Sequence, residues 1–133
     1  MILEEFLSKI KELQIKILDF IDDADDTEDN NAKKLPEISK LAQDIITCDD
    51  KNKFKIFLSL ITQISNDHHR SLFFYDKIIK ILTLFVNDIK KSFTNNEIFH
   101  IFESNKRLLL FFLEEKILVF DELIAKKVCE EKY

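Results

Sequence analysis

The polar side chains that could carry chemistry gather in a few short stretches of this 133-residue sequence. The densest is His68, His69 and Arg70, within a polar cluster over residues 65–71 that follows an apolar stretch with helical spacing. Neighbouring residues on a helix point to different faces, so the two imidazoles are not expected to chelate one metal ion together. Such side chains instead bind the last carbonyls of the preceding helix, or a carboxylate, with the arginine as a forked donor. We assign the three residues no metal and keep them as weak candidates for partner contact.

A second pair, Glu97 and His100, has the E-x-x-H spacing that places two ligands on one helical face in di-iron bundles. Such sites need a second E-x-x-H motif and two further carboxylates. The sequence contains no second E-x-x-H motif. Thr94 stands three residues before Glu97, which is the spacing of a reciprocal capping box. We therefore predict that Glu97 caps a helix and that His100 is an ordinary helical side chain.

The acidic stretch over residues 26–37 can be aligned with a calcium-binding loop, but it departs from that pattern at three positions. Asn31 replaces the turn glycine, Lys33 replaces an apolar anchor, and Pro36 interrupts the loop. Carboxylates at this density repel one another and favour solvated chain. The sequence therefore predicts an acidic loop over about residues 22–34 and no calcium site.

Composition and spacing exclude several other kinds of site. Cys48 and Cys129 match no zinc or redox motif, and each lies in a helical pattern where a thiol behaves as a small buried hydrophobe. The sequence has no Gly, so neither a P-loop nor a dinucleotide-binding loop is expected. No Ser or Cys nucleophile is recognised beside a base. We predict no catalytic residue, no metal and no cofactor; for an enzyme, the three histidines are the only imidazole candidates.

The charge and the apolar runs limit the partners that can be expected. A formal net charge of −5 does not favour binding to a phosphate backbone, so no nucleic-acid partner is predicted. The amino terminus carries acids where a secretory signal would carry bases, and no apolar run approaches the ~18 residues of a membrane span. Membrane insertion is not expected, and a reducing cytoplasm is the expected location.

Lys106 and Arg107 begin a predicted helix after a short turn in which Ser104 or Asn105 can cap it. This is the arrangement of a DNA recognition helix, which needs a basic surface. The surrounding carboxylates have the opposite sign: Glu97, Glu103, Glu114 and Glu115. We expect the two bases to pair with these acids, and we keep Lys106 and Arg107 as weak candidates for contact with a protein partner.

About seven helices must position these residues, each predicted from apolar residues spaced three and four apart. They cover about residues 2–21, 36–46, 50–64, 72–91, two segments within 95–117, and a last helix capped by Asp121. Pro36 fits the first turn of the second helix, and Asp49 or Asp50 fits the N-cap of the third. The third helix is apolar nearly all round and is expected at the centre. The first helix is apolar on several sides, so we expect it to have more than one neighbour.

The stretch from Asn95 to Ile117 is expected to be the folding centre. Leu108 to Leu113 is apolar at six consecutive positions, and we predict that this run is buried on every side. Replacing Leu110 with Asp is then expected to unfold the domain. Short polar turns and the absence of Gly predict one all-α domain over residues 1–133, a short-loop antiparallel helix array.

Two stretches are specific enough to compare with known families: SNDHHR at residues 65–70 and SNKRLLLFFLEEK at residues 104–116. On these, the chain over about residues 13–133 resembles the helical region ahead of ankyrin repeats in ankyrin-repeat proteins of flagellated protists. The resemblance implies an α-solenoid with ankyrin-like helix pairs over about residues 95–131, protein partners, and no catalytic residues. Because such proteins continue beyond the position of Tyr133, it also implies an isolated amino-terminal domain or a component of a larger assembly.

The sequence therefore predicts a non-catalytic domain for protein–protein interaction or scaffolding. A structural subunit of a larger assembly is the alternative, followed by a small helical enzyme. Other proteins are the expected partners, and the partner, the binding face and the oligomeric state are left open.

Overall fold

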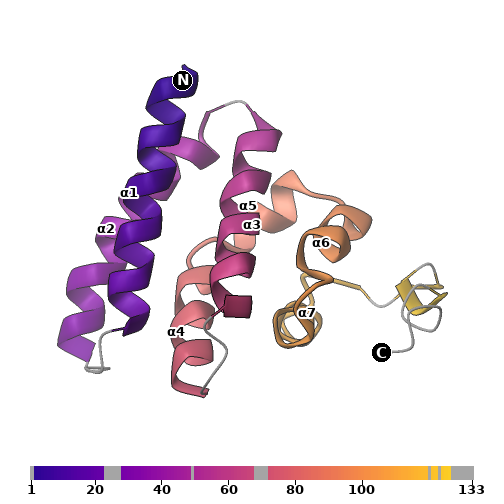
Figure 1. Cartoon of the computed structure of the whole chain (residues 1–133). Coiled ribbons are helices and arrows are strands. Elements are labelled where there is room, and N and C mark those ends of the chain that lie inside the picture. Colours follow the sequence, from indigo (N-terminus) through magenta and orange to yellow (C-terminus); the bar gives the residue numbers. More distant parts are fainter. Residues whose placement is uncertain are drawn as a thin grey trace.

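Helices make up the whole of the ordered secondary structure in the part of the chain that the structure describes. The computed structural model describes residues 2–22, 28–48, 50–67, 72–119, 121–122 and 124–126. Its helices are α1 (Leu3–Asp22), α2 (Glu28–Ile46), α3 (Lys51–Asp67), α4 (Leu72–Thr83), α5 (Val86–Ser92), α6 (Asn95–Phe102) and α7 (Lys106–Glu114). Figure 1 shows α1 and α2 at one edge of the array and α6 and α7 at the other. The predicted all-α class is confirmed.

The first two helices pack as antiparallel neighbours. Three ion pairs join them: Lys9 to Asp44 at 2.8 Å, Lys16 to Glu37 at 3.1 Å, and Lys34 to Asp19 at 3.0 Å. Each step forward along α1 is matched by an equal step backward along α2, so the three pairs define one antiparallel register. The side chains are partly exposed, so each pair contributes little stability by itself.

The α2 helix begins at Glu28, earlier than the sequence predicts. The predicted loop over residues 22–34 is therefore wrong for residues 28–34, which are helical. Glu28 and Asp29 fall in the first turn, where their negative charges favour the exposed N–H groups of the helix start. Pro36 consequently lies inside α2 and not in its first turn. The like charges of this segment do not prevent a helix, because Glu28 and Asp29 also interact favourably with the N–H groups at its start.

The α3 helix is central, as its apolar pattern predicts, since it contacts α1, α2, α4 and α6. Asp50 caps it by accepting a hydrogen bond from the N–H of Asn52 at 3.0 Å. Its Phe57 ring packs edge to face on Phe85, with ring centroids 5.5 Å apart. The core is thus built around one helix that is buried along most of its length.

The helix predicted over residues 72–91 is broken into α4 and α5. The N–H groups of Leu84 and Phe85 bond to carbonyls three residues earlier, and Phe85 leaves helical geometry with φ −118° and ψ 6°. Neither Pro nor Gly marks this position in the sequence. We attribute the break to the complete burial of Phe85 against Phe57, where tertiary packing outweighs helix propensity.

The predicted caps of the last helices are present. Thr94 and Glu97 form a capping box at the start of α6, with reciprocal hydrogen bonds of 3.3 Å and 3.0 Å between backbone N–H and side-chain oxygen. Asn105 caps α7 by accepting from the N–H of Leu108 at 3.1 Å. Asp121 accepts a hydrogen bond of 2.9 Å from the N–H three residues later.

The prediction that the run from Leu108 to Leu113 is buried on every side is wrong. Leu108 and Phe112 are fully buried, but the side chain of Leu110 is 55% exposed. Because α7 lies at the edge of the array, one face packs inward and the opposite face meets solvent (Figure 1). Leu110→Asp is therefore no longer expected to unfold the domain.

Among the described helices, α1 packs mainly on α2, α3 and α4, in agreement with its wide apolar pattern. Even so, several large apolar side chains at this helix remain exposed: Ile2, Leu3, Leu7 and Ile15. None of the described helices combines the length and the hydropathy that a membrane span requires.

Candidate functional site

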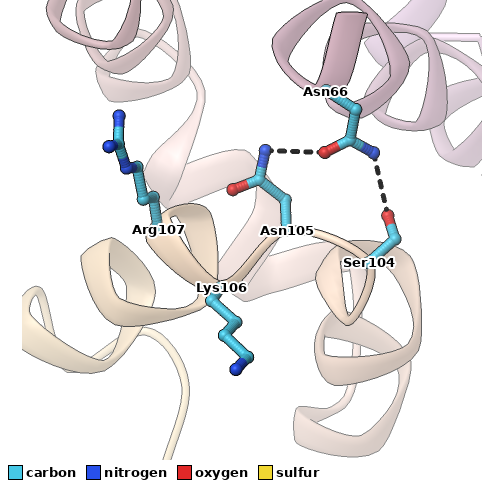
Figure 2. A pocket seen from close by; sticks show the side chains of 5 residues that line it. All are labelled: Asn66, Ser104, Asn105, Lys106 and Arg107. Carbon is cyan, nitrogen blue, oxygen red and sulfur yellow. Dashed lines mark hydrogen bonds between the residues drawn. The ribbon is translucent and has the colours of Figure 1, made fainter. Parts of the chain in front are cut away.

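Two of the predicted contact residues line a surface hollow at the start of α7. The hollow has a volume of about 370 Å³ and is lined by Asn66, Ser104, Asn105, Lys106 and Arg107 (Figure 2). Asn66 comes from the last turn of α3, and the other four come from the α6–α7 turn and the first turn of α7. The remaining predicted contact residues, His68, His69 and Arg70, lie outside the described residues.

Asn105 ties this turn to α3. Its Nδ2 donates hydrogen bonds to Ser65 Oγ and Asn66 Oδ1, both at 3.0 Å. Its Oδ1 accepts from the N–H of Leu108, while Asn66 Nδ2 donates to Ser104 Oγ at 3.3 Å. Figure 2 shows the side chains of Asn66, Ser104 and Asn105 linked in this way between α3 and the turn. One carboxamide therefore caps α7 and also fixes the turn on α3.

Tyr75 of α4 holds the first turn of α7 from a second side. Its hydroxyl donates to the backbone carbonyl of Arg107 at 3.1 Å, and the Arg107 guanidinium lies 5.7 Å from the centre of its ring. Burial raises the pKa of the Tyr75 hydroxyl, and the charge of Glu114 raises it further, while Arg107 lowers it. The hydroxyl therefore stays protonated at neutral pH and remains a donor.

Lys106 and Arg107 are both exposed, and their side chains point in different directions from the turn (Figure 2). Because the two charged ends do not converge, they do not form a clamp for a single phosphate or carboxylate. Each can instead pair with a separate acidic group on a partner surface. The turn thus carries two exposed basic side chains on a backbone that is held by α3 and α4.

The Glu97 and His100 pair has the structural role predicted for it. The Glu97 carboxylate completes the capping box and also accepts a hydrogen bond from Lys51 Nζ at 2.6 Å. The bond from Lys51 lowers the pKa of Glu97, and the bonds from Thr94 lower it further. His100 is exposed, with its Nδ1 3.5 Å from the carboxylate of Glu103. Over the described ranges, no three His, Cys, Asp or Glu side chains gather where they could hold a metal ion.

Sequence reasoning missed two polar residues with structural roles. Lys77 is fully buried, and its Nζ lies 4.3 Å from the centre of the Phe20 ring. Lys77 stands four residues before Ile81, which places both on the same face of α4. Because Ile81 belongs to the apolar stripe, this spacing predicts that Lys77 is buried. Asn95 exchanges two hydrogen bonds with the backbone of Val119, at 2.6 Å and 2.8 Å, and fastens the segment after α7 to the start of α6. That contact leaves no local pattern in the sequence.

Over the described residues, the fold and the site together define a helical array in which hydrogen bonds join the α6–α7 turn to α3. Comparison of the chain with protein-family models, curated proteins and solved structures gives no match. The resemblance to the helical region of protist ankyrin-repeat proteins therefore stays a prediction from the sequence.

Proposed function

We propose that this chain is a non-catalytic protein–protein interaction or scaffolding domain, and that the α6–α7 turn is its contact surface. The proposal agrees with the resemblance to the helical region of protist ankyrin-repeat proteins, in which helix pairs present a surface to other proteins. We place the domain in the cytoplasm, where the free thiol of Cys48 stays reduced.

The observation that carries the proposal is the anchored backbone of the turn that bears two exposed bases. Asn105 holds the first turn of α7 on α3, and the Tyr75 hydroxyl holds it on α4. Lys106 and Arg107 therefore project from a frame that does not have to be ordered when a partner binds, which reduces the entropic cost of association. Two separated positive charges fit a protein surface that carries two separated acidic groups.

Affinity capture from an extract of the cells that make this protein tests the proposal. The native chain is compared with the Lys106→Glu, Arg107→Glu double variant, and the retained proteins are identified by mass spectrometry. We expect the native chain to retain a partner at fixed stoichiometry and the variant to lose it. Charge reversal replaces attraction to acidic groups with repulsion.

The matched control is the Lys90→Glu, Lys91→Glu double variant, which reverses two adjacent exposed bases in the last turn of α5. Circular dichroism establishes that both variants fold. Retention by the control, combined with weaker binding at higher salt, supports the contact. Equal retention by both double variants would move the contact away from this turn, and a native chain that retains no protein contradicts the proposal.

A structural subunit of a larger assembly is the second candidate function, and the surface of α1 favours it. Leu3 is 66% exposed and Leu7 is 54% exposed on a helix that lies at the edge of the array (Figure 1). Large apolar side chains that cluster on an exposed helix are typical of subunit contacts.

A further inference from the structure

The exposed apolar residues of α1 belong to a regular stripe. Leu3, Leu7, Ile10 and Gln14 follow one another at steps of four, three and four residues, which is the a/d spacing of a coiled coil. Leu3 and Leu7 are exposed, and Ile10 is partly buried. A hollow of about 530 Å³ lies along this stripe, lined by Leu7, Ser8, Ile10, Lys11 and Gln14. The stripe therefore has the pattern of a helix–helix seam, and the described helices leave its Leu3 and Leu7 exposed.

The two edges of the stripe differ in chemistry. Along one edge, Phe6 and Leu13 are buried in the core of the chain itself. Along the other edge stand Glu4 and Lys11, which are both exposed. Glu4 and Lys11 are seven residues apart, so they occupy equivalent heptad positions and carry opposite charges.

We propose that a second copy of this chain covers the stripe, with the two α1 helices antiparallel. In an antiparallel pair, equivalent edges of the two helices meet, so Glu4 of one copy faces Lys11 of the other. Two-fold symmetry forms this ion pair twice. In the same register, Leu7 of each copy packs on Ile10 of the other, and the stripe is covered along its length.

A parallel pair does not give this charge complementarity. In that arrangement, the edge with Glu4 and Lys11 meets the opposite edge of the other helix. That edge consists of Phe6 and Leu13, which are apolar, so neither charge finds a partner there. The charges thus favour the antiparallel arrangement. The dimer is independent of the proposed role of the α6–α7 turn, because the two surfaces lie on different helices.

Sedimentation velocity of the full chain over a wide range of protein concentrations tests the dimer. We expect a reversible dimer in the native chain. Leu7→Glu is expected to raise its dissociation constant roughly a hundredfold, because each copy then places a carboxylate in an apolar contact. Ile15→Glu is the matched control, since Ile15 is 66% exposed on the same helix but lies off the stripe. This control is expected to dimerise like the native chain.

Exchanging the charges tests the antiparallel register. Lys11→Glu is expected to weaken the dimer about tenfold, because carboxylates then face each other at both ends. Adding Glu4→Lys to the same chain restores opposite charges and is expected to return the dissociation constant to near its native value. Circular dichroism of each variant shows whether the loss of the dimer results from unfolding of the chain.

Three results would overturn the proposal. The first is a folded native chain that stays monomeric up to the highest concentration that solubility allows. The second is a dimer that Leu7→Glu leaves as strong as before. The third is a double charge variant that dimerises no better than Lys11→Glu alone, which would rule out the antiparallel register.

Discussion

Lys116 has a backbone conformation that is usually given to glycine. Its φ of 59° lies in the left-handed region. The N–H of Lys116 bonds to the carbonyl of Leu113 at 3.1 Å, and the N–H of Ile117 bonds to that of Phe112 at 2.9 Å. These two bonds form the Schellman motif that ends α7. A side chain with a Cβ in this region costs about 1 kcal/mol, and this sequence has no Gly to avoid the cost.

Lys116→Gly is expected to stabilise the domain by about 0.5–1 kcal/mol, because removing the Cβ relieves more strain than the added freedom of the unfolded chain costs. Unfolding in denaturant, followed by circular dichroism, gives the free energy of unfolding of each variant. Lys116→Ala keeps the Cβ and is expected to stay close to the native value. A glycine variant no more stable than the alanine variant would show that the motif holds Lys116 without strain.

At the scale of single residues, the sequence predicts the polar contacts that close within one turn. Thr94 with Glu97, Asn105 and Asp50 are of this kind, because a capping side chain finds its partner two or three residues away. The contact between Asn95 and Val119 spans 24 residues and leaves no local pattern. Helix caps can therefore be predicted from the sequence, whereas hydrogen bonds between segments that are far apart in the chain cannot.

At the scale of the helix, the existence of helices is easier to predict than their ends and faces. The break at Phe85 has no local signal, because it follows from the packing of that ring against Phe57 on another helix. The early start of α2 at Glu28 follows from charges at a helix end, which a simple count of like charges treats as unfavourable. The first difference depends on three-dimensional placement, whereas the second comes from an interaction within one turn of the same helix.

The α7 helix allows a direct comparison of a buried and an exposed leucine within one apolar run. Leu110→Asp is expected to change the free energy of unfolding by less than about 1 kcal/mol, because its side chain already meets solvent. Leu108→Asp, two residues earlier and fully buried, is expected to destabilise by several kcal/mol, about 3 or more, because it buries an unpaired charge. Thermal unfolding followed by circular dichroism compares the two. Equal losses would mean that α7 is covered on both faces in solution.

At the scale of the whole molecule, the all-α class and the central place of α3 could be predicted. A helix with so many apolar positions needs several neighbours, and α3 contacts α1, α2, α4 and α6, although Ile56 on its outer face is 49% exposed. The way in which α6 and α7 dock on this centre could not be predicted. Their polar joint depends on Asn105 meeting Ser65 and Asn66, which lie about 40 residues earlier in the chain.

The joint at Asn105 is expected to hold the last helix pair on the rest of the molecule. Asn105→Ala should lower the free energy of unfolding by about 1–3 kcal/mol, because it removes the cap of α7 and the two bonds to α3. Asn66→Ala leaves the cap intact and should cost less than about 1 kcal/mol. A double-mutant cycle of the two is expected to give a coupling energy of at least about 0.5 kcal/mol.

Amide hydrogen exchange shows which helices lose stability in the Asn105→Ala variant. In Asn105→Ala, exchange is expected to become faster in α6 and α7 and to stay unchanged in α1 and α2, whose antiparallel register does not depend on the joint. Asn105→Asp keeps an oxygen that can cap α7 and accept from Ser65 Oγ, so it should recover much of the lost stability. If the two alanine substitutions are instead additive, the bond between Asn105 and Asn66 contributes no stability. The bond to Ser65 would then be the link from Asn105 to α3, beside the bond that Tyr75 of α4 makes to the first turn of α7.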